Sequence, residues 1–122
     1  MPESHRQKLY FHPAAKKDYQ NLPAPIQDDA GHNLDRVQQG LQPECKFGYL
    51  SGIGSGVQEL KIPYDTNTYR IVYVVKLSAG IFVLDAFNKK SPTGNKLSKN
   101  IQERISSRYE DAKEYSRQLS QS

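Results

Sequence analysis

The stretch from Gly54 to Ser91 reads GSGVQELKIPYDTNTYRIVYVVKLSAGIFVLDAFNKKS and decides the fold. It holds three runs that are rich in Val, Ile, Leu, Tyr and Phe and are separated by short turns. This pattern is typical of an antiparallel meander. Strands are therefore predicted over Val57 to Ile62, Tyr69 to Leu77 and Ile81 to Phe87.

The predicted strands carry cations at recurring places, namely Lys61, Arg70, Lys89 and Lys90. A charged side chain inside a strand is costly to bury, so it must face water, an acid or a polyanion. Arg70 begins a run of valines on one face of its strand. Either it pairs with Glu59 or it opens into an anionic site, because a guanidinium group suits both carboxylate and phosphate.

Helical periodicity flanks the strands on both sides. Apolar residues recur at helical spacing in Ala14 to Leu22 and again from Ile26 to Gly40, which predicts a helical hairpin. A longer apolar stripe from Leu97 onward predicts a C-terminal helix, and Lys8 to His12 is expected to add a short first strand. We expect an α+β domain in which these helices pack on a small antiparallel sheet and share one core.

Length and charge limit the class of protein. At 122 residues the chain is long enough for one core, so a single domain over residues 1–122 is expected. Lysine and arginine number 17 against 13 acidic residues, and the net charge of +4 permits an anionic partner. No apolar run approaches the roughly 20 residues of a membrane span, and the N-terminus has no apolar signal core. A soluble, cytoplasmic protein without membrane association is predicted.

The residues that usually bind metals or cofactors are sparse. Cys45 is the only cysteine, so it has no partner for an internal disulfide. The three histidines, His5, His12 and His32, fall in the first quarter of the sequence without metal-ligand spacing. No metal and no cofactor is expected, and Cys45 is interpreted as a loop residue without chemistry.

Further side chains are candidates for contacts to an anionic partner. Arg104 and Arg108 flank the apolar stripe of the C-terminal helix, so one or both are able to reach the cations of the sheet. Tyr64, Tyr69 and Tyr73 are able to stack on bases. The alternative is that these tyrosines fill the core with their hydroxyls at its edge.

The ordered combination of motifs resembles the RelE/ParE toxin superfamily, and specifically its phage-derived HigB-like branch. Members of that branch look like L-x-G-x-G-x-G-v-x-E-L-[RK], then Y-R-x-x-Y, then a strand ending F-x-K-K-S, then a helix with an arginine. Here these elements are Leu50 to Lys61, Tyr69 to Tyr73, Phe87 to Ser91 and the helix carrying Arg108. The similarity spans about Leu9 to Tyr115.

The resemblance implies a RelE-like fold and the toxin of a type II toxin–antitoxin system. Such a toxin is a ribosome-dependent, metal-independent mRNA endoribonuclease, or mRNA interferase, and arrests translation. Arg70, Lys89 and Lys90 are then the candidate catalytic residues: Arg70 clamps the phosphate, Lys89 transfers a proton and Lys90 adds positive potential. The candidate RNA-binding residues are Lys61, Arg108 and Tyr73.

The resemblance also implies partners, which are mRNA on the ribosome and a cognate antitoxin, acidic or of helix-turn-helix type, encoded by a neighbouring gene. Two alternatives stay open: an inhibitor of DNA gyrase like ParE, and a non-catalytic RNA-binding module. Asp85 stands where many relatives have a histidine or another polar residue, which argues against chemistry assisted by histidine.

The cations are predicted to face solvent or RNA. On that expectation, Arg70→Ala and Lys90→Ala abolish RNA cleavage and leave thermal stability nearly unchanged. Unfolding of Arg70→Ala indicates instead that Arg70 pairs with Glu59.

Overall fold

The computed structural model describes residues 6–89 and 97–121 of the chain, which form three helices and five strands. The α+β class predicted from the sequence is confirmed. In chain order the elements are β1 Leu9–Phe11, α1 Pro13–Gln20, α2 Ala24–Gln38, β2 Lys46–Tyr49, β3 Val57–Tyr64, β4 Asn67–Leu77, β5 Gly80–Lys89 and α3 Lys99–Ser120.

The five strands form one mixed sheet in the order β1-β5-β4-β3-β2. Neighbours from β2 to β5 run antiparallel, as the meander pattern predicts. The expectation of a purely antiparallel sheet was wrong, because β1 pairs parallel to β5 with Tyr10 opposite Phe82. The alternation of side chains along a strand does not depend on the direction of its neighbour, and the long connection from β1 to β5 permits the parallel pairing.

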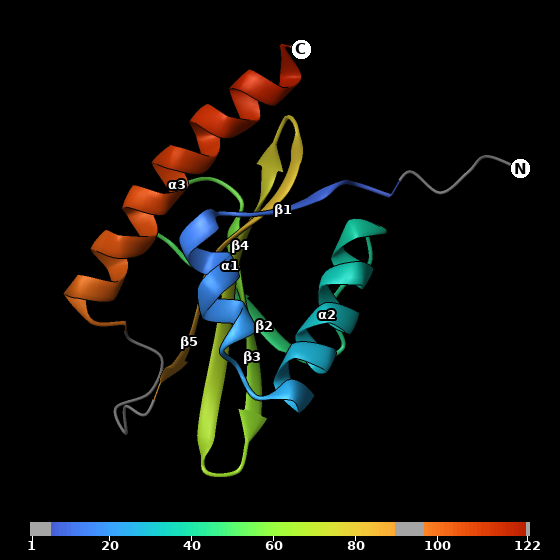
Figure 1. Ribbon diagram of the computed structural model, residues 1–122, viewed down its shortest axis with the longest axis vertical. Helices are drawn as coiled ribbons and strands as arrows, with labels where there is room; N and C mark the ends of the chain where they lie inside the picture. The colour runs from blue at the N-terminus through green and yellow to red at the C-terminus, as the bar shows by residue number, and fades with distance from the viewer. Residues whose placement is uncertain (1–5, 90–96, 122) are drawn as a thin grey trace, which may run out of the picture.

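Helices cover both faces of the sheet (Figure 1). On one face, Leu34 of α2 belongs to a core with Ile71 and Tyr73 of β4. On the other face, Ile105 of α3 belongs to a core with Val72 of β4. The expectation of one shared core was therefore wrong. Since β4 is apolar on both faces, one layer of helices buries only half of its apolar side chains.

Capping side chains fix where α1 and α3 begin. His12 Nδ1 accepts a hydrogen bond of 3.1 Å from the backbone N–H of Ala14, next to Pro13 in the first turn of α1. His12 Nε2 lies 2.8 Å from Asp111 Oδ2 and so links the start of α1 to α3. At the start of α3, Ser98 Oγ accepts from the backbone N–H of Ile101.

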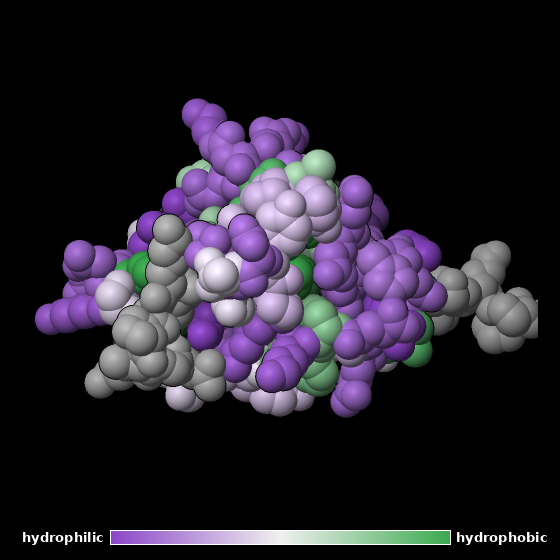
Figure 2. All heavy atoms as spheres, turned by 90° about the horizontal axis from the view of Figure 1, so that it is seen from below, coloured by the Kyte–Doolittle hydropathy of each residue, from purple (hydrophilic) through white to green (hydrophobic). Residues whose placement is uncertain are grey.

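The surface at the end of the molecule that carries the β3–β4 turn is mostly hydrophilic, with scattered apolar residues (Figure 2). Within residues 6–89 and 97–121, no helix has the length and apolar character needed to cross a membrane. The apolar side chains of α3 are used instead to cover the sheet.

Candidate functional site

A row of cations crosses the α3 face of the sheet. Lys46 of β2 lies opposite Lys61 of β3, Lys61 lies opposite Arg70 of β4, and Arg70 lies opposite Phe87 of β5. Residues directly opposite one another on neighbouring strands share a face of the sheet. The register thus brings together two of the cations predicted from the sequence, Lys61 and Arg70, and adds Lys46.

Arg70 forms a buried ion pair with Glu59. Arg70 Nη1 donates to Glu59 Oε1 at 2.9 Å and to Oε2 at 3.1 Å, and each residue is only 3% exposed. The Lys61 ammonium lies 4.0 Å from Glu59 Oε2, so this one carboxylate serves two cations. Of the two alternatives left open by the sequence, the structure shows the pairing with Glu59. Arg70 does not simply face solvent, which removes the basis for expecting Arg70→Ala to keep its stability.

A second buried acid, Asp85, holds both arginines of α3. The β4–β5 register shifts between Val72, which lies opposite Asp85, and Tyr73, which lies opposite Val83. This irregularity sets the fully buried Asp85 on the α3 face, where Arg104 Nε donates to Oδ2 at 2.7 Å. Arg104 Nη2 donates to Oδ1 at 3.1 Å, and Arg108 Nη1 lies 3.3 Å from the same oxygen.

Arg104 extends the row of cations toward α3. Its guanidinium carbon lies 5.7 Å from the ring centroid of Phe87, which is the cross-strand neighbour of Arg70. The side chain of Arg104 is 42% exposed, so it is available to a partner. Sequence reasoning placed Arg104 beside the buried stripe but selected Arg108 as the candidate. A signal for Arg104 existed in Asp85, an acid within an apolar strand that required a cation.

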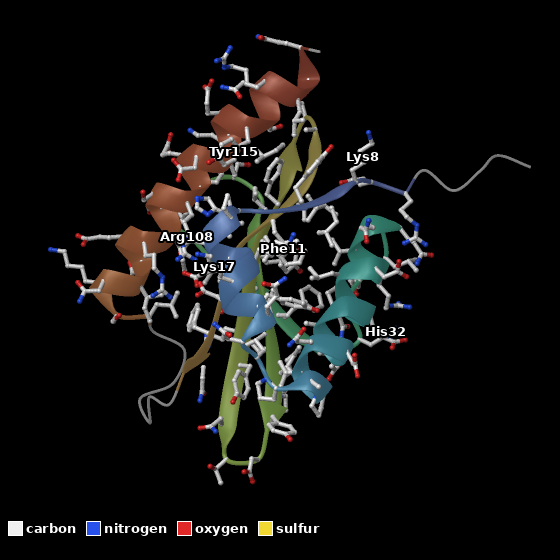
Figure 3. All side chains as sticks on the ribbon, in the orientation of Figure 1. Lys8, Phe11, Lys17, His32, Arg108 and Tyr115 are labelled. Atoms are coloured by element: carbon white, nitrogen blue, oxygen red, sulfur yellow. The ribbon has the colours of Figure 1, made fainter. Side chains whose placement is uncertain are left out.

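Arg108 is committed to contacts within the fold. Its Nη1 donates to Asp18 Oδ2 of α1 at 3.0 Å and to the carbonyl oxygen of Leu84 at 3.1 Å, in addition to the contact with Asp85. Figure 3 shows Arg108 between α3 and α1. With its side chain 14% exposed, Arg108 contributes positive charge and joins the two helices.

A pocket of about 370 Å³ opens beside this row on the α3 face. Glu59 and Lys61 of β3 line one side of it, and Gln102 of α3 lines another. Gly48, opposite Glu59 in the sheet, contributes no side chain to fill it. The pocket therefore combines a carboxylate, an ammonium and an amide in a lining that is mostly polar. The remaining lining residues are Tyr49, Leu50, Ser51, Ile53 and Leu97.

Tyr73 does not join this group. It lies on the face covered by α1 and α2, is fully buried, and donates from its hydroxyl to Gln58 Oε1 at 3.1 Å. Burial raises the pKa of its phenol above the ordinary value. The assignment of Tyr73 as an RNA contact is therefore corrected, and the alternative of a core tyrosine with its hydroxyl at the edge is what the structure shows.

Of the two lysines in the F-x-K-K-S motif, the structure describes the backbone of the first. Lys89 is the final residue of β5, and its backbone lies opposite Thr68 of β4. Lys90 lies outside the described residues. The backbone of β5 thus places Lys89 two residues beyond Phe87, the cross-strand neighbour of Arg70.

Cys45 lies at the edge of the α1/α2 core and is half-buried. Burial, with a smaller contribution from the negative charge of Asp29, raises the pKa of its thiol to about 11. A thiol with a raised pKa forms little thiolate, so Cys45 is an unreactive residue that packs at the edge of this core. Among the described residues, no three His, Cys, Asp or Glu side chains are grouped so that they could hold a metal ion.

The raised pKa predicts slow alkylation of Cys45 in the folded protein. A rise of two units from the ordinary value of 9.0 lowers the thiolate fraction near neutral pH about a hundredfold. Iodoacetamide should therefore label the native protein about a hundredfold more slowly than the urea-unfolded protein at pH 8. The native rate should climb until the pH reaches about 11. Equal rates at pH 8 contradict this prediction.

Comparison with known proteins assigns the chain to a family. Residues 17–110, which are more than half of the chain and run from α1 into α3, match the family described as Phage derived protein Gp49-like (DUF891). Searches of curated proteins and of solved structures gave no match. The matched residues include the row of cations, both buried acids and both arginines of α3. The chain therefore belongs to the Gp49-like family of phage-derived proteins, a family of RelE/HigB-like toxins associated with toxin–antitoxin systems.

Proposed function

We propose that this protein is the toxin of a type II toxin–antitoxin system and that it cleaves mRNA on the ribosome. The observation that carries the proposal is the row formed by Lys46, Lys61 and Arg70, with Arg104 over its end, beside a pocket that contains a carboxylate. Clustered cations on one face attract a polyanion, and a pocket among them offers a place for one nucleotide.

The reaction proposed is attack of an RNA 2′-hydroxyl on the adjacent phosphate. It needs a proton acceptor, stabilisation of the pentavalent phosphorane and a proton for the leaving 5′ oxygen. Because the RNA carries its own nucleophile, no metal ion is needed to generate one.

Each cation has a part in this proposal. Arg70, fixed by Glu59, supplies a positive charge beneath the phosphate, and Lys61 at the pocket contacts a phosphate oxygen. Arg104, with its exposed guanidinium, binds the neighbouring phosphate through paired N–H donors, a geometry that a lysine ammonium does not provide. Two more lysines complete the proposal: Lys89, the last residue of β5, protonates the leaving oxygen, and Lys90, the next residue in the sequence, adds positive potential.

Positioning by the ribosome is part of the proposed mechanism. The cations provide electrostatic stabilisation, but a flexible RNA seldom presents its 2′-hydroxyl in line with the leaving oxygen. A ribosome that holds the message in one conformation removes much of that entropic cost. The free protein is therefore a poor general ribonuclease, and its place of action is the cytoplasm, where translation occurs.

The proposed protein partner is an antitoxin encoded by a neighbouring gene, acidic or of helix-turn-helix type. The chain carries a net charge of +4, so an acidic partner is electrostatically complementary. A partner that covers Lys61 and Arg104 excludes RNA from the pocket and neutralises the row of cations.

Mapping of RNA ends in cells after brief expression tests the proposed function. The expected result is new 5′ ends that recur in one position of the codon within translated messages. Intact messages together with DNA damage would point to a gyrase inhibitor like ParE. Intact messages that copurify with the protein would indicate RNA binding without catalysis.

A further inference from the structure

We propose that Glu59 is the proton acceptor that activates the 2′-hydroxyl, an inference that rests on the proposed ribonuclease function. Among the described residues that line the pocket, Glu59 is the one carboxylate. It lies beside Lys61, which is proposed to contact the scissile phosphate, and is anchored by Arg70, which is proposed to lie beneath it. The 2′-hydroxyl that must lose its proton is attached beside the scissile phosphate, so a base at this place is close to it.

The strand register keeps Glu59 accessible from the pocket. Gly48 lies directly opposite Glu59 on β2, so the position that a side chain would otherwise cover is empty. A Cβ atom built on Gly48 meets Lys61 Nζ at 3.8 Å, so the space over Gly48 adjoins the Lys61 ammonium. Although Glu59 is 3% exposed, it lines the pocket, as a fixed base within a recess should.

The bonding of the two buried acids separates their roles. Asp85 accepts from Ala86 and Arg104 and also lies against Arg108, so three groups already occupy its oxygens. Each oxygen of Glu59 accepts one hydrogen bond, both from Arg70 Nη1, and Lys61 Nζ lies 4.0 Å from Oε2. A carboxylate has about four acceptor positions, so Glu59 has capacity for an incoming hydroxyl. Asp85 is a structural anchor, whereas Glu59 is able to take a proton.

The proposed step balances without a metal ion or a redox partner. The 2′ oxygen forms a bond to phosphorus while its proton passes to a Glu59 oxygen. The P–O5′ bond then breaks, its electron pair goes to the 5′ oxygen, and that oxygen takes a proton from a lysine ammonium of the site. The products are a 2′,3′-cyclic phosphate and a 5′-hydroxyl. Protonated Glu59 returns its proton to the neutral amine through water and restores the starting charges.

Glu59→Gln in the full-length protein is the main test, with Glu103→Gln as a control. Gln keeps an oxygen for Arg70 but is not a base, whereas Glu103 is an exposed acid of α3 on which the identical change is made. Single-turnover cleavage on programmed ribosomes should fall more than a hundredfold in Glu59→Gln and stay within twofold in the control. Binding to a message with a 2′-deoxy nucleotide at the cut position should stay within threefold of wild type.

Binding of the 2′-deoxy message distinguishes a base from a positioning residue, because loss of a base lowers cleavage without an equal loss of RNA binding. Full cleavage by folded Glu59→Gln overturns the inference, as does a loss of RNA binding that equals the loss of cleavage. If wild type itself does not cleave on ribosomes, the proposed function fails first, and this result is distinct from a variant that cleaves like wild type.

Variants of Gly48 keep the test decisive if Glu59→Gln does not fold. The Cβ of Gly48→Ala lies at ordinary contact distance from Lys61 Nζ, so this variant should fold and serves as the stability control for the larger replacement. Gly48→Leu places a branched side chain beside Lys61, at the position opposite Glu59, while it keeps every charge of the site, and it should cleave more than a hundredfold more slowly. Full cleavage by folded Gly48→Leu overturns the assignment of Glu59.

Discussion

Arg70→Met is expected to lower the free energy of unfolding by about 3–5 kcal/mol. Arg70 and Glu59 are each 3% exposed and lie within hydrogen-bond distance of one another. Removal of the guanidinium leaves the buried carboxylate with only the Lys61 ammonium at 4.0 Å, which compensates incompletely for the lost hydration. Urea unfolding followed by circular dichroism measures the change.

Two further variants show whether the buried charge is the cause. Lys46→Met removes an exposed cation from the same row and should change the free energy of unfolding by less than about 0.5 kcal/mol. The double variant Arg70→Met/Glu59→Leu removes both charges and should be more stable than Arg70→Met alone. If Arg70→Met is as stable as wild type, Arg70 does not compensate a buried charge.

Lys61→Met is expected to reduce cleavage about a hundredfold or more while the fold persists. Lys61 lines the pocket and is proposed to stabilise the charge that develops on the phosphorane, where loss of one such contact costs about 3 kcal/mol in the transition state. Its ion pair with Glu59 spans 4.0 Å and its side chain is 21% exposed, so its contribution to stability is under about 1 kcal/mol. Single-turnover cleavage and urea unfolding measure the two effects.

Lys113→Met is the matched control for this prediction. Lys113 is an exposed lysine of α3 that pairs with Glu110 three residues earlier, away from the pocket. Its replacement makes the same chemical change and lowers the net charge equally, so cleavage within twofold of wild type is expected. Equal losses in Lys61→Met and Lys113→Met would mean that net charge, and not the site, governs activity.

The sequence predicts local structure well because each apolar run carries its own period. The run Tyr69 to Leu77 becomes β4 Asn67–Leu77, and Ile81 to Phe87 becomes part of β5 Gly80–Lys89. The two helical stripes before Gly40 likewise become α1 and α2. The observed strands extend a few residues beyond the predicted ones, because polar residues at the strand ends pair through their backbone groups, which every residue type carries.

Contacts between residues that lie far apart in the sequence could not be predicted from local patterns. The parallel pairing of β1 with β5 joins residues about 70 positions apart, and no local pattern states the direction of a partner strand. The separate core beneath α3 follows from valines that alternate with Ile71 and Tyr73 along β4. That alternation is visible in the sequence, and it requires a helix layer on each face of the sheet.

The residues of the candidate site show the same difference: those set by strand alternation were predicted, and those set by tertiary packing were not. Strand alternation and the family resemblance both selected Lys61 and Arg70, because each stands at a definite place in a strand. Arg104 was not selected, since its contact with Asp85 depends on a register shift in β5 and on the packing of α3. Tyr73 was misassigned because an aromatic residue in a strand has the same pattern whether it faces a core or an RNA base.

Cleavage of a defined message on purified ribosomes is the most direct test of the central claim, that the α3 face of the sheet cleaves mRNA during translation. The expected result is one cut within the codon in the ribosomal A site, with a 5′-hydroxyl on the downstream fragment and little cleavage of the same message without ribosomes. Lys61→Met should not produce this cut. Intact RNA on ribosomes, together with inhibition of purified DNA gyrase by the same preparation, would contradict the account.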